Sequence, residues 1–394
     1  MRALRQVTEL LLINLRSIPS RWGSTLVIVV GLAGVVALIT ALQAMSVGML
    51  ATLASTGDPD RAIVIRAGSN SELSSFVTRD EAVVIAQDPR VAANADGKPL
   101  AAGELIVIAE QRLKARDSSS NASLRGVPPV GFDLRPELSI IEGRRFEPGL
   151  QELIVGAKAH QQFEGLDIGE QVKLRGSYWT VVGVFESDGD AHESEIWADA
   201  DTAQSAFNRN AYSSMLVRLG DPADFEAFKQ AITEDPRLQA EVRTEEDFFS
   251  SQSRNFKRTI GLLVTLVGVI MGLGAIFAAL NTMYAAVSAR ETEIATLRAI
   301  GFGGGVVVVS TLIEAILLAC AGGLFGGLIA YLVFNGYTVS TLGAGFTQVA
   351  FEFRVTAPLL VSGLVLSLLI GVVGGLFPAV RAARLPVVDA LRAS

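Results

Sequence analysis

Few residues of this 394-residue chain have the types and spacing that support chemistry. Its two histidines, His160 and His192, are too few for a histidine metal cluster, and its single cysteine, Cys320, excludes a cysteine-based one. The sequence contains no G-x-x-x-x-G-K-[ST] phosphate loop, no G-x-S-x-G elbow and no H-E-x-x-H motif. We therefore expect this chain to have no catalytic site, no bound cofactor and no metal ion.

Four acidic residues and one histidine lie close together in one short stretch: Asp188, Asp190, His192, Glu193 and Glu195. Carboxylates gathered in this way can hold a divalent cation, but their spacing fits no EF-hand loop. A solvated acidic turn is the simpler interpretation, and it is the one we adopt.

A charged segment between two apolar runs, Ser288–Phe302, has the pattern of a short helix. Apolar residues at helical spacing fall near one face, charged residues lie elsewhere, and a glycine ends the helix. The apolar residues are Ile294, Leu297 and Ile300, the charged ones are Arg290, Glu291, Glu293 and Arg298, and the glycine is Gly301. Such a helix is a suitable docking surface for a partner protein, although an ordinary solvated connector has the same composition.

The elements that flank this segment are long apolar runs. A helix needs about 20 apolar residues to cross a hydrocarbon core about 30 Å thick, where every backbone polar group must be bonded internally. Four runs are long enough, over 24–50, 259–287, 305–334 and 357–380, and helix can extend back from the second run through 250–258. We therefore predict an α-helical membrane protein with one span, a large inserted domain, and three further spans.

Polar residues are rare inside these runs. Glu314 lies deep in the third span, and a buried carboxylate there is either functional or a structural hydrogen-bonding group. Small residues recur four apart, a spacing that lets helices approach closely within the chain or against a second copy. The principal pairs are Gly268 with Gly272, Gly322 with Gly326, and Gly371 with Gly375.

The distribution of charge orients the protein. The net charge is −7, yet residues 58–258 hold 34 acidic and 23 basic residues, while the short segments beside the spans are rich in arginine. Because arginine-rich flanking loops stay in the cytoplasm, we expect both termini in the cytoplasm and the inserted domain outside it. The acidic surface of that domain argues against nucleic acid as a partner.

The first residues carry Leu4, Val7, Leu11, Leu15 and Ile18 at helical spacing, with arginines between them. This pattern predicts an amphipathic helix on the membrane surface with its arginines toward lipid headgroups, or else a simple cytoplasmic extension of the first span. The first apolar run is longer than the h-region of a signal peptide, so we interpret it as an uncleaved anchor.

The inserted domain is predicted to be α+β. Short strands are expected over 62–66, 104–109, 153–155, 171–174, 179–185 and 215–219, and helices over 79–87, 201–207 and 222–233. Residues 117–123 have the small polar composition of a loop tip. The domains we predict are residues 1–57, 58–255 and 256–394.

Three motifs in order give the chain a specific resemblance. Glu291–Gly301 reads close to the E-x-x-E-I-x-x-L-R-A-I/L-G signature of FtsX-like permeases, the membrane subunits of MacB-type ABC transporters. The pair Glu314-Ala315 with the glycine-rich 321–327 is also similar, as is the ending Gly375–Pro386, with Pro378, Arg381, Arg384 and Pro386, followed by Ala390-Leu391-Arg392. Leu138–Phe146 and Glu152–Gly156 resemble the MacB-type periplasmic domain more weakly.

The resemblance implies the membrane half of an ATP-driven exporter in a bacterial inner membrane. In that family two permease chains pair, a cytoplasmic ABC ATPase binds the coupling loop, here Arg290–Gly301, and movement is transmitted to the periplasmic domains. A periplasmic adaptor and an outer-membrane channel are further partners that the resemblance suggests. The alternatives are lipoprotein extraction, signalling to a periplasmic cell-wall hydrolase, and a receptor without an ATPase.

Overall fold

A computed structural model describes residues 22–114, 117–342 and 348–384. The described chain divides into two compact units, each considered by itself. The helical unit holds the residues up to Val47, Arg258–Tyr337 and the residues from Phe353 onward. The extramembrane unit holds Gly48–Lys257 and Thr338–Glu352. The predicted amphipathic helix of the first 21 residues, Pro386 and the residues after it lie outside the described residues.

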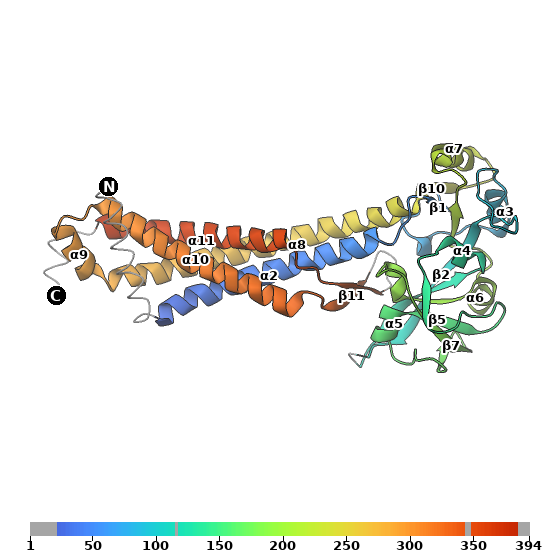
Figure 1. The fold of residues 1–394 in the computed structure, drawn as a ribbon, viewed down its shortest axis with the longest axis horizontal. Coiled ribbons are helices and arrows are strands. Elements are labelled where there is room, and N and C mark those ends of the chain that lie inside the picture. The colour runs from blue at the N-terminus through green and yellow to red at the C-terminus, as the bar shows by residue number, and fades with distance from the viewer. Residues whose placement is uncertain (1–21, 115–116, 343–347, 385–394) are drawn as a thin grey trace. The chain divides into compact units, whose positions relative to one another are not determined.

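Four helices in the described chain are long and apolar enough to cross a membrane, and they are drawn as the long coiled ribbons of Figure 1. One precedes the large mixed α/β region and three follow it, which confirms the predicted one-plus-three architecture. A short helix, α9 (Glu291–Ala299), joins the second and third of them. The four are α2 (Trp22–Ala54), α8 (Glu245–Ser288), α10 (Gly304–Phe334) and α11 (Ala357–Arg384).

Helix α8 begins well before its apolar part. Its first turn carries Glu245, Glu246 and Asp247, and negative charge at a helix N-terminus is favoured by the exposed N–H groups and the helix dipole. The predicted extension through 250–258 is therefore confirmed, and it reaches further, to Glu245.

Apolar packing joins α2, α10 and α11 within the helical unit. Leu32, Val35 and Ile39 of α2 form a buried cluster with Ala319 of α10 and Ile370 of α11. A helix that is packed on one side only keeps large side chains exposed on the other side. Leu266 and Phe277 of α8 are exposed in this way, which suits a lipid environment.

The extramembrane unit is built on one mixed sheet with the strand order β10-β1-β9-β2-β3-β8-β5-β7-β4, and β6 pairs with β7 beside β4. The pairs β3–β8 and β5–β7 are parallel, and the others are antiparallel. The strands are β1 (Arg61–Arg66), β2 (Ala101–Arg112), β3 (Ser119–Val127), β4 (Ser139–Gly143), β5 (Glu152–Gly156), β6 (Gln171–Leu174), β7 (Ser177–Glu186), β8 (Glu195–Asp199), β9 (Ser214–Arg218) and β10 (Ala240–Thr244).

Short helices cover the sheet at its two largest apolar cores. One core lies under β1, β9 and β10 and includes Phe228 and Ile232, and the other lies under β3, β5, β7 and β8 and includes Phe163 and Trp179. The helices are α3 (Arg79–Ala86), α4 (Val130–Leu134), α5 (Ala157–Gln162), α6 (Ala200–Ala206) and α7 (Phe225–Glu234), with single turns η2 (Glu72–Ser74), η3 (Ala191–Ser194) and η4 (Pro222–Asp224). The predicted α+β class is confirmed.

Buried ion pairs connect the two cores. Arg125 of β3 contacts Glu104 at 2.6 Å, Glu195 at 2.7 Å and Glu72 at 3.0 Å. Burial opposes the charge on Glu104, but the guanidinium groups of Arg135 and Arg125 lower the pKa of its carboxyl to about 2. Charges buried in this way must be paired to be tolerated, and the pairs link β3 to β2, to β8 and to the turn at Glu72.

Two of the differences between the predicted and observed strands concern polar segments. Residues 117–123, expected as a loop tip, include the first half of β3, because Ser119–Ser123 pair with Ile108–Arg112 of β2 through backbone bonds that need no apolar side chains. The polar loop between α10 and α11 contains a hairpin of β11 (Thr338–Leu342) and β12 (Gln348–Glu352), which belongs to the extramembrane unit.

Candidate coupling site

The connection between α8 and α10 is the charged helix that the sequence predicts. Helix α8 ends at Ser288, two residues turn, and α9 runs from Glu291 to Ala299. Glu291 and Glu293 lie in its first turn and Arg298 in its last, which matches the helix dipole at both ends. Gly301 follows with φ +107°, a backbone conformation that favours glycine, and this ends the helix.

Arg290 ties this helix to the next span. Its Nε lies 2.9 Å from an oxygen of Glu293, and its Nη1 lies 3.5 Å from an oxygen of Glu314 in α10. The side chains of Arg290 and Glu314 are only 12% and 10% exposed, so this pair is weakly screened by solvent. Glu314 therefore lies at the base of α9, which the sequence alone did not indicate.

The apolar residues of α9 divide between two environments. Ile294 is buried with Val287 of α8, Val307 of α10 and Ala382 of α11. Leu297 is half-buried and Ile300 is 72% exposed. The three residues that were predicted to share a face therefore differ in burial. Ile294 is buried, whereas Ile300 is exposed because it is the C-terminal cap, where the chain turns away at Gly301.

The glycine pairs differ in what they contact. A Cβ at Gly322 or Gly326 would lie within 2.7 Å of α2 atoms, and one at Gly371 or Gly375 would lie within 2.5 Å of an alanine of α10. Gly268 has ordinary contact with Ile39, and Gly272 has nothing within 4 Å. Close helix packing therefore occurs at four of the six predicted positions.

The C-terminal motif lies at the end of α11. Pro378 is buried inside the helix, and Arg384 is its last residue. The guanidinium of Arg381 lies over the ring of Tyr284 in α8, 5.5 Å from its centre. This cation–π contact holds the end of α11 against the end of α8, close in sequence to the start of α9.

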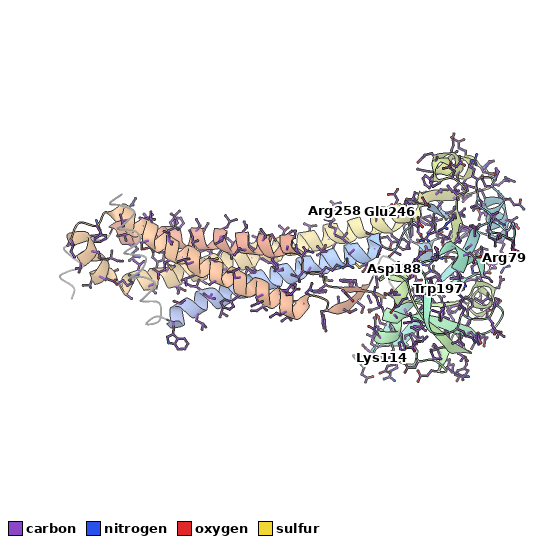
Figure 2. All side chains as sticks on the ribbon, in the orientation of Figure 1. Arg79, Lys114, Asp188, Trp197, Glu246 and Arg258 are labelled. Atoms are coloured by element: carbon purple, nitrogen blue, oxygen red, sulfur yellow. The ribbon has the colours of Figure 1, made fainter. Side chains whose placement is uncertain are left out.

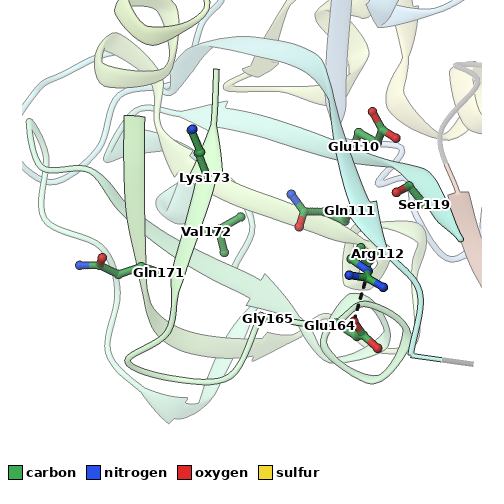
Figure 3. A pocket seen from close by; sticks show the side chains of 9 residues that line it. All are labelled: Glu110, Gln111, Arg112, Ser119, Glu164, Gly165, Gln171, Val172 and Lys173. Atoms are coloured by element: carbon green, nitrogen blue, oxygen red, sulfur yellow. Dashed lines mark ion pairs between the residues drawn. The ribbon is translucent and has the colours of Figure 1, made fainter. Parts of the chain in front are cut away.

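The extramembrane unit has an open groove of about 430 Å³ between the end of the β2–β3 hairpin and β6 (Figure 3). Its lining carries charges of both signs, with Arg112 3.7 Å from Glu164 and Lys173 on the opposite side. Mixed charge without a buried unpaired group gives the groove no clear ligand preference.

The acidic stretch near residue 190 is not a solvated turn, and our interpretation was wrong. Asp190, His192 and Glu193 are each less than 7% exposed. Both buried acidic side chains have a charged or polar partner. Glu193 lies 3.3 Å from Lys158, which is distant in sequence, and Asp190 lies 2.8 Å from Nδ1 of the buried His192. In the part of the chain that the structure describes, no three potential ligands gather to hold a metal ion.

Comparison with known families identifies both halves of this arrangement. A family model of the MacB-like periplasmic core domain matches residues 22–235, which is more than half of the chain. A model of the FtsX-like permease C-terminal domain matches residues 265–387 and so contains α9, Glu314 and all of α11. The chain belongs to the MacB/FtsX-type ABC transporter permeases.

Curated relatives are similar over most of this chain. The macrolide export ATP-binding/permease protein MacB of Neisseria meningitidis is 27% identical over 389 residues, which cover 92% of this permease and 57% of that protein. The MacB protein of Hahella chejuensis is 28% identical over 305 residues, covering 72% and 45%. The permease thus spans about half the length of the curated relatives it matches.

A solved structure, the periplasmic region of MacB from Actinobacillus actinomycetemcomitans, covers 54% of this permease with 12% identity and a TM-score of 0.36. The family resemblance seen in the sequence is confirmed by the two domain matches. The matched regions are permease domains, and such permeases work with an ABC ATPase.

Proposed function

We propose that this permease is the membrane subunit of an ATP-driven exporter that works by mechanotransmission. A separate cytoplasmic ABC ATPase docks on α9, and its nucleotide cycle moves the spans and, through them, the extramembrane unit. The observation that supports this most directly is the anchoring of α9. Arg290 holds α9 to Glu314 of α10 at 3.5 Å, and Ile294 buries its inner face, while Ile300 remains 72% exposed.

This geometry suits a docking helix. Ile300 is an exposed isoleucine at the end of a helix whose opposite side is fixed. It offers a partner an apolar contact that cannot move independently of the spans. A partner bound there would shift α9 together with α8, α10 and α11, because Ile294 is buried in one cluster with side chains of all three.

We place the permease in a bacterial inner membrane with both termini cytoplasmic and the extramembrane unit in the periplasm. Arginine in the short flanking segments supports that orientation. A second copy of this chain completes the transporter, and lipid surrounds it. A periplasmic adaptor and an outer-membrane channel would complete a tripartite efflux system, in keeping with the macrolide export named for the relatives.

Affinity capture of the full chain from its native membrane in mild detergent, followed by mass spectrometry, tests the proposal. We expect a P-loop ATPase to be captured with it. Glu293→Lys with Leu297→Asp, or Ile300→Asp alone, should reduce that capture at least tenfold, since a charge left buried and unpaired at an interface costs about 2–5 kcal/mol.

Ile141→Asp is the matched control, because Ile141 is a 46% exposed isoleucine of the extramembrane unit, and it should leave ATPase capture unchanged. Recovery of an adaptor with the ATPase would support tripartite export. Recovery of a cell-wall hydrolase or a lipoprotein carrier instead would redirect the function to signalling or lipoprotein extraction. A complex without any ATPase contradicts the proposal.

A further inference from the structure

The acidic stretch, buried except at Asp188 and Gly189, forms a tightly bonded unit that we name the junction segment, Ser187–Ser194. The Glu193 carboxylate accepts the N–H groups of Ser187 at 2.9 Å and Gly189 at 2.8 Å. The Ser187 hydroxyl donates to Asp190 at 3.0 Å, and Lys158 donates to the Gly189 carbonyl at 2.6 Å. A segment cross-bonded in this way moves as one piece.

The end of α2 is bonded to the junction segment. The Ala191 N–H donates to the hydroxyl of Thr56 at 3.0 Å, and that hydroxyl donates to the Thr52 carbonyl at 2.7 Å. Thr52 lies in the last turns of α2, the helix that contains the first predicted span. Displacement of this end of α2 therefore acts on the backbone of the junction segment.

The hairpin between α10 and α11 is bonded to the junction segment as well. The Ala350 N–H of β12 donates to the hydroxyl of Ser194 at 2.9 Å. Gln348 of the same strand donates to Ser120 at 2.6 Å and accepts from Gln162 at 2.7 Å. At Gly48 of α2, an added Cβ would lie 1.9 Å from the Glu352 carbonyl oxygen, so β12 and α2 are also in direct backbone contact.

The start of α8 makes the third contact. The ring of Phe249 meets His192 edge-on, 5.9 Å between centres. Four residues earlier, Glu245 lies 2.6 Å from Arg61 of β1, which fixes the first turn of α8 to the sheet. The junction segment thus contacts segments of the chain that lead directly into all four spans. Strand β8 follows the junction segment without a break. Figure 2 labels Asp188 of the junction segment and Trp197 of β8.

We propose that the junction segment is the point at which displacement of the spans is passed to the sheet of the extramembrane unit, with Ser194 as a positioning residue that keeps the hairpin attached. This inference rests on the proposed function. Because β8 pairs with both β3 and β5, movement of the segment reaches the centre of the sheet. Closely packed, cross-bonded elements pass displacement on rather than absorb it.

The test uses the full permease with its captured ATPase in lipid nanodiscs. Two quantities are measured: the ATP hydrolysis rate, and the difference in hydrogen exchange of β8 and β3 peptides between the nucleotide-free and ATP–vanadate states. In Ser194→Ala, hydrolysis should continue while that exchange difference falls about fivefold or more, the range of an ordinary coupling free energy. Ser205→Ala, whose hydroxyl bonds only within α6, is the matched control and should behave like the parent.

A rescue separates transmission from folding. In a Cys320→Ala background, Ser194→Cys with Ala350→Cys should lose the exchange response when reduced and regain it when the disulfide forms. Thr341→Cys with Val349→Cys links the hairpin only to itself, across a register pair, and should not respond to oxidation in this way.

Two different results would overturn the inference. If the parent responds to nucleotide, and Ser194→Ala and the reduced cysteine pair respond equally, then the junction segment has no role in transmission, while the proposed function stands. A parent without a bound ATPase removes the proposed function and this inference together.

Discussion

Asp190 and His192 form a buried pair whose charge depends on pH. Burial disfavours the imidazolium, but the Asp190 carboxylate 2.8 Å away raises the pKa of His192, with a smaller contribution from Glu195 and opposition from Arg135. Burial likewise disfavours the carboxylate, and His192 lowers the pKa of Asp190. Each group therefore stabilises the charged form of the other.

The sign of the pH dependence follows from these directions. The His192 contribution to stability is full below its unfolded pKa, about 6.5, and is lost as pH rises through the higher folded value. The Asp190 contribution is present above its unfolded pKa, about 3.9, and is lost as pH falls through the lower folded value. The pair thus stabilises the extramembrane unit most at mildly acidic pH.

We expect His192→Gln to weaken the fall in thermal midpoint between pH 6 and pH 8.5, measured on the detergent-solubilised full chain. His160→Gln is the control, because His160 pairs with Asp167 at an exposed position where solvent screens the interaction. Asp190→Asn should destabilise most near pH 6, by about 3 kcal/mol, the cost of breaking a buried pair, and less at pH 8.5, where the His192 contribution fades. An unchanged pH profile in His192→Gln would contradict the assignment.

At the scale of elements, backbone proximity determines how the spans pack. Gly326 of α10 faces α2, with the Ala33 carbonyl oxygen 2.5 Å from where a Cβ would lie. Gly371 of α11 faces α10 in the same way, 2.4 Å from the Ala319 methyl group. These helices approach closely because glycine leaves room for a neighbouring backbone.

Gly326→Ala and Gly371→Ala should each destabilise the helical unit by about 1–3 kcal/mol, the usual cost of overpacking, seen as a lower unfolding midpoint in detergent. Gly272→Ala, at a position with nothing within 4 Å, should leave the midpoint of the single chain unchanged. Equal effects at all three positions would show that the close contacts are not what stabilises the packing.

The spans and their order could be predicted from sequence because apolar length alone specifies a membrane helix. The β11–β12 hairpin could not, because its strands are short and of mixed polarity and it is held by Gln162, Ser120 and Ser194, which are more than 150 residues away. The same cause hid the junction segment. Its carboxylates look solvated until Lys158 and the surrounding Trp197 and Phe249 are placed by the fold.

The coupling helix was predictable for a different reason. Its charge pattern, its terminal glycine and its position between two spans are all local, and α9 forms within the expected residues. Its anchor was not predictable, because nothing local indicates that Arg290 would reach Glu314 in the next helix. Local patterns therefore located the candidate site, while its attachment depended on packing.

At the scale of the whole molecule, charge asymmetry predicts which side of the membrane each region occupies. Single cysteines in a Cys320→Ala background test this in intact spheroplasts with a membrane-impermeant maleimide. Ser118→Cys, in the extramembrane unit, should react before permeabilisation, and Thr292→Cys, on the exposed side of α9, only after it. The reverse pattern would invert the topology and remove α9 from the reach of a cytoplasmic ATPase.

The hairpin has a consequence for anyone who exchanges parts between permeases of this type. Suppose that a graft replaces only the stretch between the first and second spans. It would then import the residues at positions 120, 162 and 194 from the donor but keep β12, which bonds to them, from the recipient. The two stretches, far apart in the gene, form one interchangeable cassette. Natural recombination and laboratory chimeras alike must inherit both pieces from the same parent to keep them matched.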